Sequence, residues 1–147
     1  MTKRDDLLNL PFDPETFFEV AKQVGHGRAL GLDYVGTIGN EIELALPWRE
    51  ELVGRVAEGF FASGAIVSLI DTSGGAAVWL ATGTFQHIAT IDLRIDYLRP
   101  APKGETVYAR CRCDKLTRQI AFVSGIAHTG DPAHPVAKAS ATYILNP

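Results

Sequence analysis

Residues 63–80 are the longest run of apolar and small residues in the chain, and Asp71 is the one charged residue among them. A helix that is apolar on all sides is expected to be buried, because no face is left for water. A carboxylate inside such a helix is costly unless partners or partial solvation compensate it. Gly74 and Gly75 each weaken the helix by about 1 kcal/mol relative to Ala, and we interpret them as points of close packing against a sheet. Asp71 is therefore predicted to be a functional residue.

The segment before this helix predicts a short helix, two strands and a loop. Residues 14–24 carry apolar side chains near helical spacing and predict an amphipathic helix, which three following glycines break. Strands are predicted at 32–38 and 41–46, joined by a Gly-Asn pair that tolerates the positive φ of a hairpin turn. A proline ends the second strand, and residues 48–61 are predicted to be a loop.

After the long helix the pattern changes to alternation, which predicts strands near residues 90–97, 105–114, 119–128 and 136–145. In the first of them the apolar side chains expected to face the core are Ile91, Leu93, Ile95 and Tyr97. Short connections make the last strands antiparallel neighbours. Such a sheet needs an apolar partner on one face, and the long helix is large enough to supply it. The pattern predicts an α+β domain.

Composition and charge narrow the class of protein. A chain of 147 residues, 46% hydrophobic and 21% charged, suits one domain over 1–147, with residues 1–28 as an N-terminal helical extension. No basic run suggests nucleic acid binding. The start has no apolar region typical of a secretory signal, and the polar groups in 63–80 argue against a membrane span. Cys111 and Cys113 are expected to be reduced core residues of a cytoplasmic protein.

Three segments of the chain are informative when they are taken together. Gly59 to Asp71 combines a glycine, a small-residue turn and a helix carrying an acid. Thr90 to Ala101 is a long strand with a turn, and Arg118 to Val123 pairs with the closing segment Val136 to Tyr143. These segments resemble the PaaI-type (phenylacetate-pathway-type) acyl-CoA thioesterases of the hotdog superfamily, over about residues 30–145. The resemblance implies a hotdog fold, in which an antiparallel β-sheet wraps one long central helix.

The resemblance also implies an activity and a site. Relatives hydrolyse acyl-CoA without a metal or redox cofactor, coenzyme A being part of the substrate. They form homodimers with sheets joined edge to edge, or dimers of dimers, with sites at the subunit interface. Asp71 matches the catalytic acid, which acts as nucleophile or as general base. The Ser63 N–H matches an oxyanion donor, and Thr90 matches a hydroxyl that positions water. The substrate-binding positions are Ala62, Gly64 and Phe61.

Two positions depart from the family pattern. Ala62 stands where relatives carry a His, with Ser63 in place of the following Gly, and Val56 stands where they often carry an Asn. These departures keep open a non-catalytic hotdog protein that binds acyl-CoA or another apolar ligand. A hotdog dehydratase or hydratase ranks last, because no His lies near Asp71 in sequence.

Several residues have an ordinary structural interpretation beside the functional one. Ser63 is favoured as a helix N-cap, Thr90 is a common strand residue, and the aromatic pair ending in Phe61 suits a core. Four cations could hold coenzyme A phosphates but are expected to be solvated surface: Arg55, Arg99, Lys103 and Arg118. The four histidines show no metal-binding spacing, so no metal site is expected.

Overall fold

The computed structural model of the protein describes residues 8–147. Residues 1–7, which begin the predicted N-terminal extension and the segment examined for a secretory signal, lie outside the described residues. The elements are α1 (Pro14–Ala21), α2 (Gly25–Leu30), β1 (Asp33–Ile38), β2 (Glu41–Leu46), a 3-10 turn (Glu50–Leu52), β3 (Val53–Arg55), β4 (Phe60–Phe61), α3 (Ser63–Thr82), β5 (Ile88–Tyr97), β6 (Val107–Leu116), β7 (Ile120–His128) and β8 (Ala137–Leu145).

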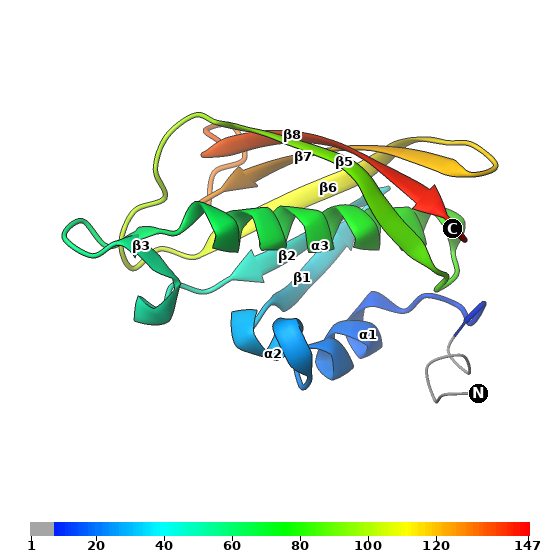
Figure 1. The fold of residues 1–147 in the computed structure, drawn as a ribbon, viewed down its shortest axis with the longest axis horizontal. Coiled ribbons are helices and arrows are strands. Elements are labelled where there is room, and N and C mark those ends of the chain that lie inside the picture. The colour runs from blue at the N-terminus through cyan, green and yellow to red at the C-terminus, as the bar shows by residue number, and fades with distance from the viewer. Residues whose placement is uncertain (1–7) are drawn as a thin grey trace.

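One six-stranded antiparallel sheet and one long helix organise the chain (Figure 1). The strand order is β1-β2-β6-β7-β8-β5, so β1 and β5 form the two edges. The inner face of the sheet packs against α3, while β3 and β4 form a separate small ribbon near the start of that helix. The predicted α+β arrangement of a long central helix on an antiparallel sheet is confirmed.

The helices and turns before α3 differ from the sequence prediction in detail. The first helix ends at Ala21, three residues early. Of the glycines expected to break it, Gly25 and Gly27 lie within α2, and Gly31 ends α2 in the left-handed conformation. Gly27 explains the difference, because a Cβ there would collide with the backbone oxygen of Ala21, so this tight helix pair requires glycine. The predicted loop 48–61 holds a 3-10 turn and two short strands.

The predicted inward position of Ile91 is wrong. Thr90 lies opposite Tyr143 and Asp92 lies opposite Thr142, so Ile91 is an extra residue that forms a β-bulge. Its side chain is 57% exposed. The bulge shifts the alternation by one residue and turns Thr90 towards α3.

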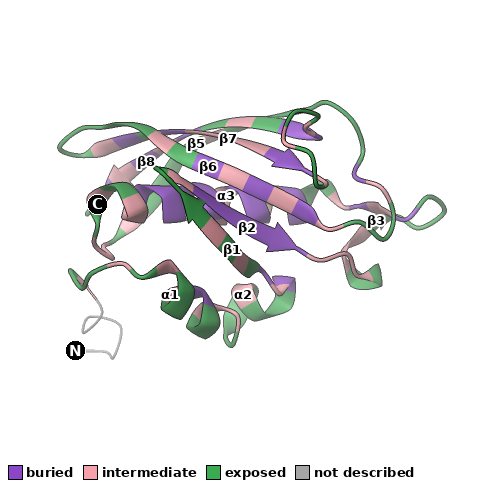
Figure 2. Ribbon diagram, turned by 180° about the vertical axis from the view of Figure 1, so that it is seen from behind, coloured by how far each residue is buried: buried purple, intermediate pink, exposed green. Residues whose placement is uncertain are grey.

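The prediction that the long helix is buried all round is also wrong. One stripe of α3 remains partly exposed between α2 and β5, and we refer to it as the open stripe: Gly64, Val67, Ser68, Asp71 and Thr72. These residues recur at helical spacing and therefore lie along one face. By length and composition α3 would also suit a membrane span, but 56% of its apolar window is buried inside the protein (Figure 2). Asp71 thus gains partial solvation.

Close packing of the helix glycines against the sheet is confirmed. A Cβ at Gly74 would collide with the Tyr143 hydroxyl, and one at Gly75 would lie 3.2 Å from the Ile88 Cδ1. Gly74 lies directly beneath the tyrosine that reaches across from β8. The glycine therefore sets how near α3 comes to the sheet.

A polar network lies on the opposite, outer face of the sheet. The Glu43 Oε2 accepts a hydrogen bond from the Arg110 Nε at 2.8 Å and lies 3.0 Å from the His128 Nε2. The N–H of Gly130 donates to the His128 Nδ1. Burial opposes ionisation of Glu43, but hydrogen bonds from Arg110 and His128 outweigh it and lower the pKa of the carboxyl. The charged form of Glu43 is therefore part of the folded state.

Replacing Gly74 by Ala is expected to lower the free energy of unfolding by about 2 kcal/mol, because the added methyl group overpacks the contact with Tyr143. Gly64→Ala is the matched control, since a Cβ there meets nothing within 4 Å. Urea unfolding of both variants measures the difference. A Gly74→Ala protein as stable as the Gly64→Ala protein would show that the helix is not held this close.

Glu43→Gln is expected to lower stability at pH 7 by about 2 kcal/mol, because it leaves Arg110 without its partner. A carboxyl with a lowered folded pKa stabilises above its unfolded pKa, and this contribution is lost as the pH falls through the folded value. The difference from the wild type should therefore shrink towards pH 3. Glu41→Gln is the control, because its 3.9 Å pair with Arg112 is partly exposed and contributes little.

Candidate functional site

Asp71 and Thr90 meet between α3 and β5. The Thr90 hydroxyl donates a 2.8 Å hydrogen bond to the Asp71 Oδ1, although the two residues are nineteen positions apart. The bulge at Ile91 makes this contact possible, because strict alternation would have placed Thr90 on the outer face with Asp92. Two of the residues predicted to be catalytic are therefore neighbours in the structure.

Tyr143 is a third member of this site that the sequence analysis did not identify. Its hydroxyl donates to the Asp71 Oδ1 at 3.2 Å and lies 3.0 Å from the Asp71 backbone oxygen. The side chain is only 2% exposed. Burial, and then the nearby Asp71 carboxylate, raise the pKa of the Tyr143 phenol, so it remains a donor. The signal in the sequence was present but indirect, since Tyr143 ends the last segment of the family resemblance.

Thr90 and Tyr143 orient the Asp71 carboxylate through one of its two oxygens. Both bind Oδ1, and among residues 8–147 no donor to Oδ2 is found. A carboxylate held through one oxygen can accept a proton on the other. Asp71 lies on the open stripe, where a substrate and a water molecule can reach it. The geometry suits a general base.

The predicted substrate-binding residues lie at the start of α3. Phe61, Ala62, Ser63 and Gly64 help to line a hollow of about 490 Å³, together with Gly54, Arg55, Phe60 and Pro100. Ala62 is the N-cap and Ser63 the first helical residue, so the interpretation of Ser63 as the N-cap is wrong. Phe61 is buried, as its core interpretation requires. The first N–H groups of a helix lack intrahelical acceptors and attract negative charge.

Within one chain these two groups of residues are separate. Asp71 follows Ser63 by eight residues on the same helix, which is about 12 Å along the axis. The hollow at the helix start does not include Asp71, Thr90 or Tyr143. One chain therefore presents two parts of a site.

A histidine does lie near the open stripe, contrary to the expectation from sequence distance. The His26 Nε2 of α2 lies 3.0 Å from the Ser68 hydroxyl, one helical turn before Asp71. No local sequence pattern predicts this contact, because the two residues are 42 positions apart. It shows that α2 flanks the open stripe.

Three of the four cations considered for phosphate binding have partners within the chain. Arg55 pairs with Glu58 at 3.1 Å. Arg99 donates to the backbone oxygen of His134 at 2.8 Å. Lys103 lies 6.0 Å from the ring centroid of Trp48. Of these, only Arg55 lines the hollow at the start of α3.

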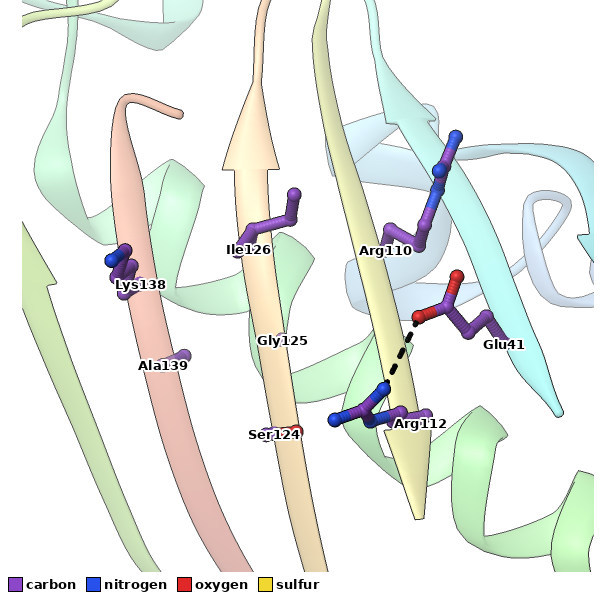
Figure 3. A pocket seen from close by; sticks show the side chains of 8 residues that line it. All are labelled: Glu41, Arg110, Arg112, Ser124, Gly125, Ile126, Lys138 and Ala139. Carbon is purple, nitrogen blue, oxygen red and sulfur yellow. Dashed lines mark ion pairs between the residues drawn. The ribbon is translucent and has the colours of Figure 1, made fainter. Parts of the chain in front are cut away.

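Three further cations, Arg110, Arg112 and Lys138, line a hollow on the outer face of the sheet, shown in Figure 3. Arg110 pairs with Glu43, and Arg112 donates to Asp114 at 2.7 Å besides its contact with Glu41. These carboxylates offset the positive charge, so the hollow offers little attraction to an anion. It also faces away from α3 and Asp71.

Metal ligands and reactive thiols do not converge in the part of the chain that the structure describes. No three His, Cys, Asp or Glu side chains gather there in a way that could hold a metal ion. Both cysteines of β6 are free. Cys111 is a buried core residue, and its burial raises the pKa of the thiol to about 12.

Sequence comparisons identify relatives that are named as a putative esterase and as a thioesterase. A profile described as the thioesterase superfamily matches residues 58–135. A putative esterase of Halobacterium salinarum is 39% identical over 81 residues, a match that spans 53% of this chain and only about half, 53%, of that relative. The medium/long-chain acyl-CoA thioesterase YigI of Escherichia coli is 28% identical over 131 residues, covering 80% of this chain and 83% of YigI.

Solved structures confirm the predicted hotdog fold. A thioesterase of Haemophilus influenzae superposes with a TM-score of 0.80 at 21% identity, covering 95% of this chain and 94% of its own. A mutant of the phenylacetic acid degradation protein PaaI of Thermus thermophilus superposes with a TM-score of 0.67 at 22% identity, covering 80% of this chain and 95% of the PaaI chain. At such identities the likeness concerns the fold.

Proposed function

Because the chain belongs to the thioesterase superfamily, we propose that it hydrolyses the thioester of an acyl- or aryl-CoA to the free acid and coenzyme A. The observation that carries the proposal is the orientation of Asp71, whose Oδ1 is held by Thr90 and Tyr143. The similarity to the acyl-CoA thioesterase YigI supports the substrate class.

In the proposed reaction Asp71 is the general base. Its Oδ2 takes a proton from a water molecule while the water oxygen attacks the thioester carbonyl carbon. The negative charge that forms on the carbonyl oxygen is stabilised by backbone N–H groups at the start of α3, with that of Ser63 as the leading donor. The carbonyl then re-forms as the C–S bond breaks, the leaving coenzyme A thiolate takes the proton held by Asp71, which restores the carboxylate, and the acid is released.

We further propose that the active unit is a homodimer, alone or in a dimer of dimers, in the cytoplasm. The separation of about 12 Å between Asp71 and Ser63 along α3 supports a site shared between subunits, with Asp71 of one facing the helix start of the other. The edge strand β5 also carries exposed apolar side chains, including Ile91 and Tyr97. An unpaired apolar edge is a liability that pairing with a second copy removes.

Asp71→Asn is expected to lower the release of free thiol from acyl-CoA about 1,000-fold, because the amide cannot accept the proton of water. The assay follows thiol release from a panel of short-chain, long-chain and aryl-CoA thioesters. Asp92→Asn is the matched control, because Asp92 is exposed on the same strand as Thr90. Turnover by Asp71→Asn at the wild-type rate, with the fold intact by circular dichroism, would sink this role.

Thr90→Val is expected to reduce kcat about 10-fold, since it keeps the shape of the side chain but removes a hydrogen bond to a charged group. Thr90→Ser should stay within a few-fold of the wild type. Thr142→Val is the control, because Thr142 of β8 lies opposite Asp92, whereas Thr90 lies opposite Tyr143. Equal losses in Thr90→Val and Thr142→Val would show that the loss is structural.

A second function, binding without cleavage, is favoured by one observation. Two polar side chains that relatives carry are absent from this chain. The N-cap Ala62 has only a methyl group, and Val56 has an apolar side chain that is 90% exposed. A folded protein that binds butyryl-CoA in calorimetry, but releases no thiol from any member of the panel, would establish this alternative.

A further inference from the structure

A hollow of about 220 Å³ lies between the N-terminal helices and α3. Its apolar lining comes from Phe18, Leu30 and Leu32, each at most 5% exposed. Thr72 of the open stripe contributes the wall on the α3 side. A concave apolar lining beside polar groups is what small-molecule sites require.

Polar side chains at this hollow are already engaged with their neighbours. Lys22 pairs with Glu19 at 2.8 Å and lies 3.6 Å from Asp33, so its charge is compensated. His26 is held by the Ser68 hydroxyl at 3.0 Å, which ties α2 to α3. The hollow therefore offers apolar contact rather than a charged recognition site.

The hollow opens beside the candidate base. Thr72 directly follows Asp71, and Ser68 precedes it by one helical turn, so all three belong to the open stripe. A thioester whose carbonyl carbon lies near Asp71 can direct its acyl group towards α2. Figure 1 shows α1 and α2 on the side of α3 away from β7 and β8, so this path leaves the contact of Asp71 with Thr90 and Tyr143 undisturbed.

We propose that this hollow is the acyl subsite, and that it selects short aliphatic or single-ring acyl groups. The inference rests on the proposed thioesterase function and specifies its substrate class. Sites that bury drug-sized ligands measure roughly 300–1,000 Å³, and a hollow of about 220 Å³ is smaller. Because of this volume, the acyl groups that fit are expected to be shorter than the medium and long chains for which YigI is named.

Except for Thr72, the residues that line the hollow lie outside the segment that the family profile matches. Phe18, His26, Leu30 and Leu32 all precede residue 58, where the match begins, whereas Asp71 and Thr90 lie within it. Selectivity can therefore change through the N-terminal helices while the base and its partners stay the same. A substitution that fills the hollow should change which acyl group is accepted, not whether hydrolysis occurs.

The test compares kcat and KM for acetyl-, butyryl-, benzoyl- and decanoyl-CoA in variants that fill or enlarge the hollow. Thr72→Leu fills it and should lower kcat/KM for butyryl- and benzoyl-CoA about 10-fold through KM, leaving acetyl-CoA within about 2-fold. Phe18→Leu enlarges the hollow and should raise kcat/KM for decanoyl-CoA relative to kcat/KM for butyryl-CoA. Val20→Leu is the control, an exposed residue of the same helix that lines a different hollow.

The outcomes separate this inference from the proposed function. Equal changes in kcat/KM for all four thioesters, or no change for any of them, would overturn the assignment of the hollow as the acyl subsite. If the wild type cleaves none of them, the proposed function fails, and calorimetry on Asp71→Asn decides the subsite alone. Tighter binding of butyryl-CoA than of free coenzyme A, abolished by Thr72→Leu, would support it, whereas equal binding of the two would overturn it.

Discussion

The contact of Tyr143 with α3 at Gly74 determines how the rest of the site is arranged. A phenol hydroxyl that is almost fully buried needs a hydrogen-bond partner, and Asp71 supplies two acceptors, its backbone oxygen and its Oδ1. Only a residue without a Cβ at position 74 lets the ring come this close. The weakening of the helix by glycine is therefore offset by packing that orients the carboxylate.

The sequence was informative where a pattern is local. Alternation predicted the strands of the sheet within a few residues, and an acid in an apolar helix identified Asp71. Local patterns failed where one extra residue changed the phase. The bulge at Ile91 places Thr90 opposite Tyr143, whereas uninterrupted alternation groups Thr90 with the outward Asp92. The family resemblance gave Thr90 as a hydroxyl that positions water, and it gave no geometric reason for the hydrogen bond that the structure shows between Thr90 and Asp71.

Contacts between distant residues could not be predicted from spacing. Tyr143 reaches Asp71 across 72 positions, and His26 meets Ser68 across 42. The helix α2 was missed for a related reason, because glycine disfavours helices on average. Here the close approach of Gly27 to the backbone of Ala21 requires glycine, so tertiary packing overrides the local preference. The same packing brings α2 beside the open stripe.

The open stripe also explains why a helix this apolar can carry an acid. A carboxylate buried on all sides is costly unless partners or partial solvation compensate it. Exposure along one face allows solvation, while Thr90 and Tyr143 hold Oδ1 in place. In the proposed reaction, substrate on the stripe would displace bulk water and leave the attacking water molecule at Asp71, and the interaction of the carboxylate with developing charge would strengthen. A partly exposed carboxylate on the core helix is thus compatible with a stable fold, and the proposed reaction uses the oxygen that this exposure leaves free.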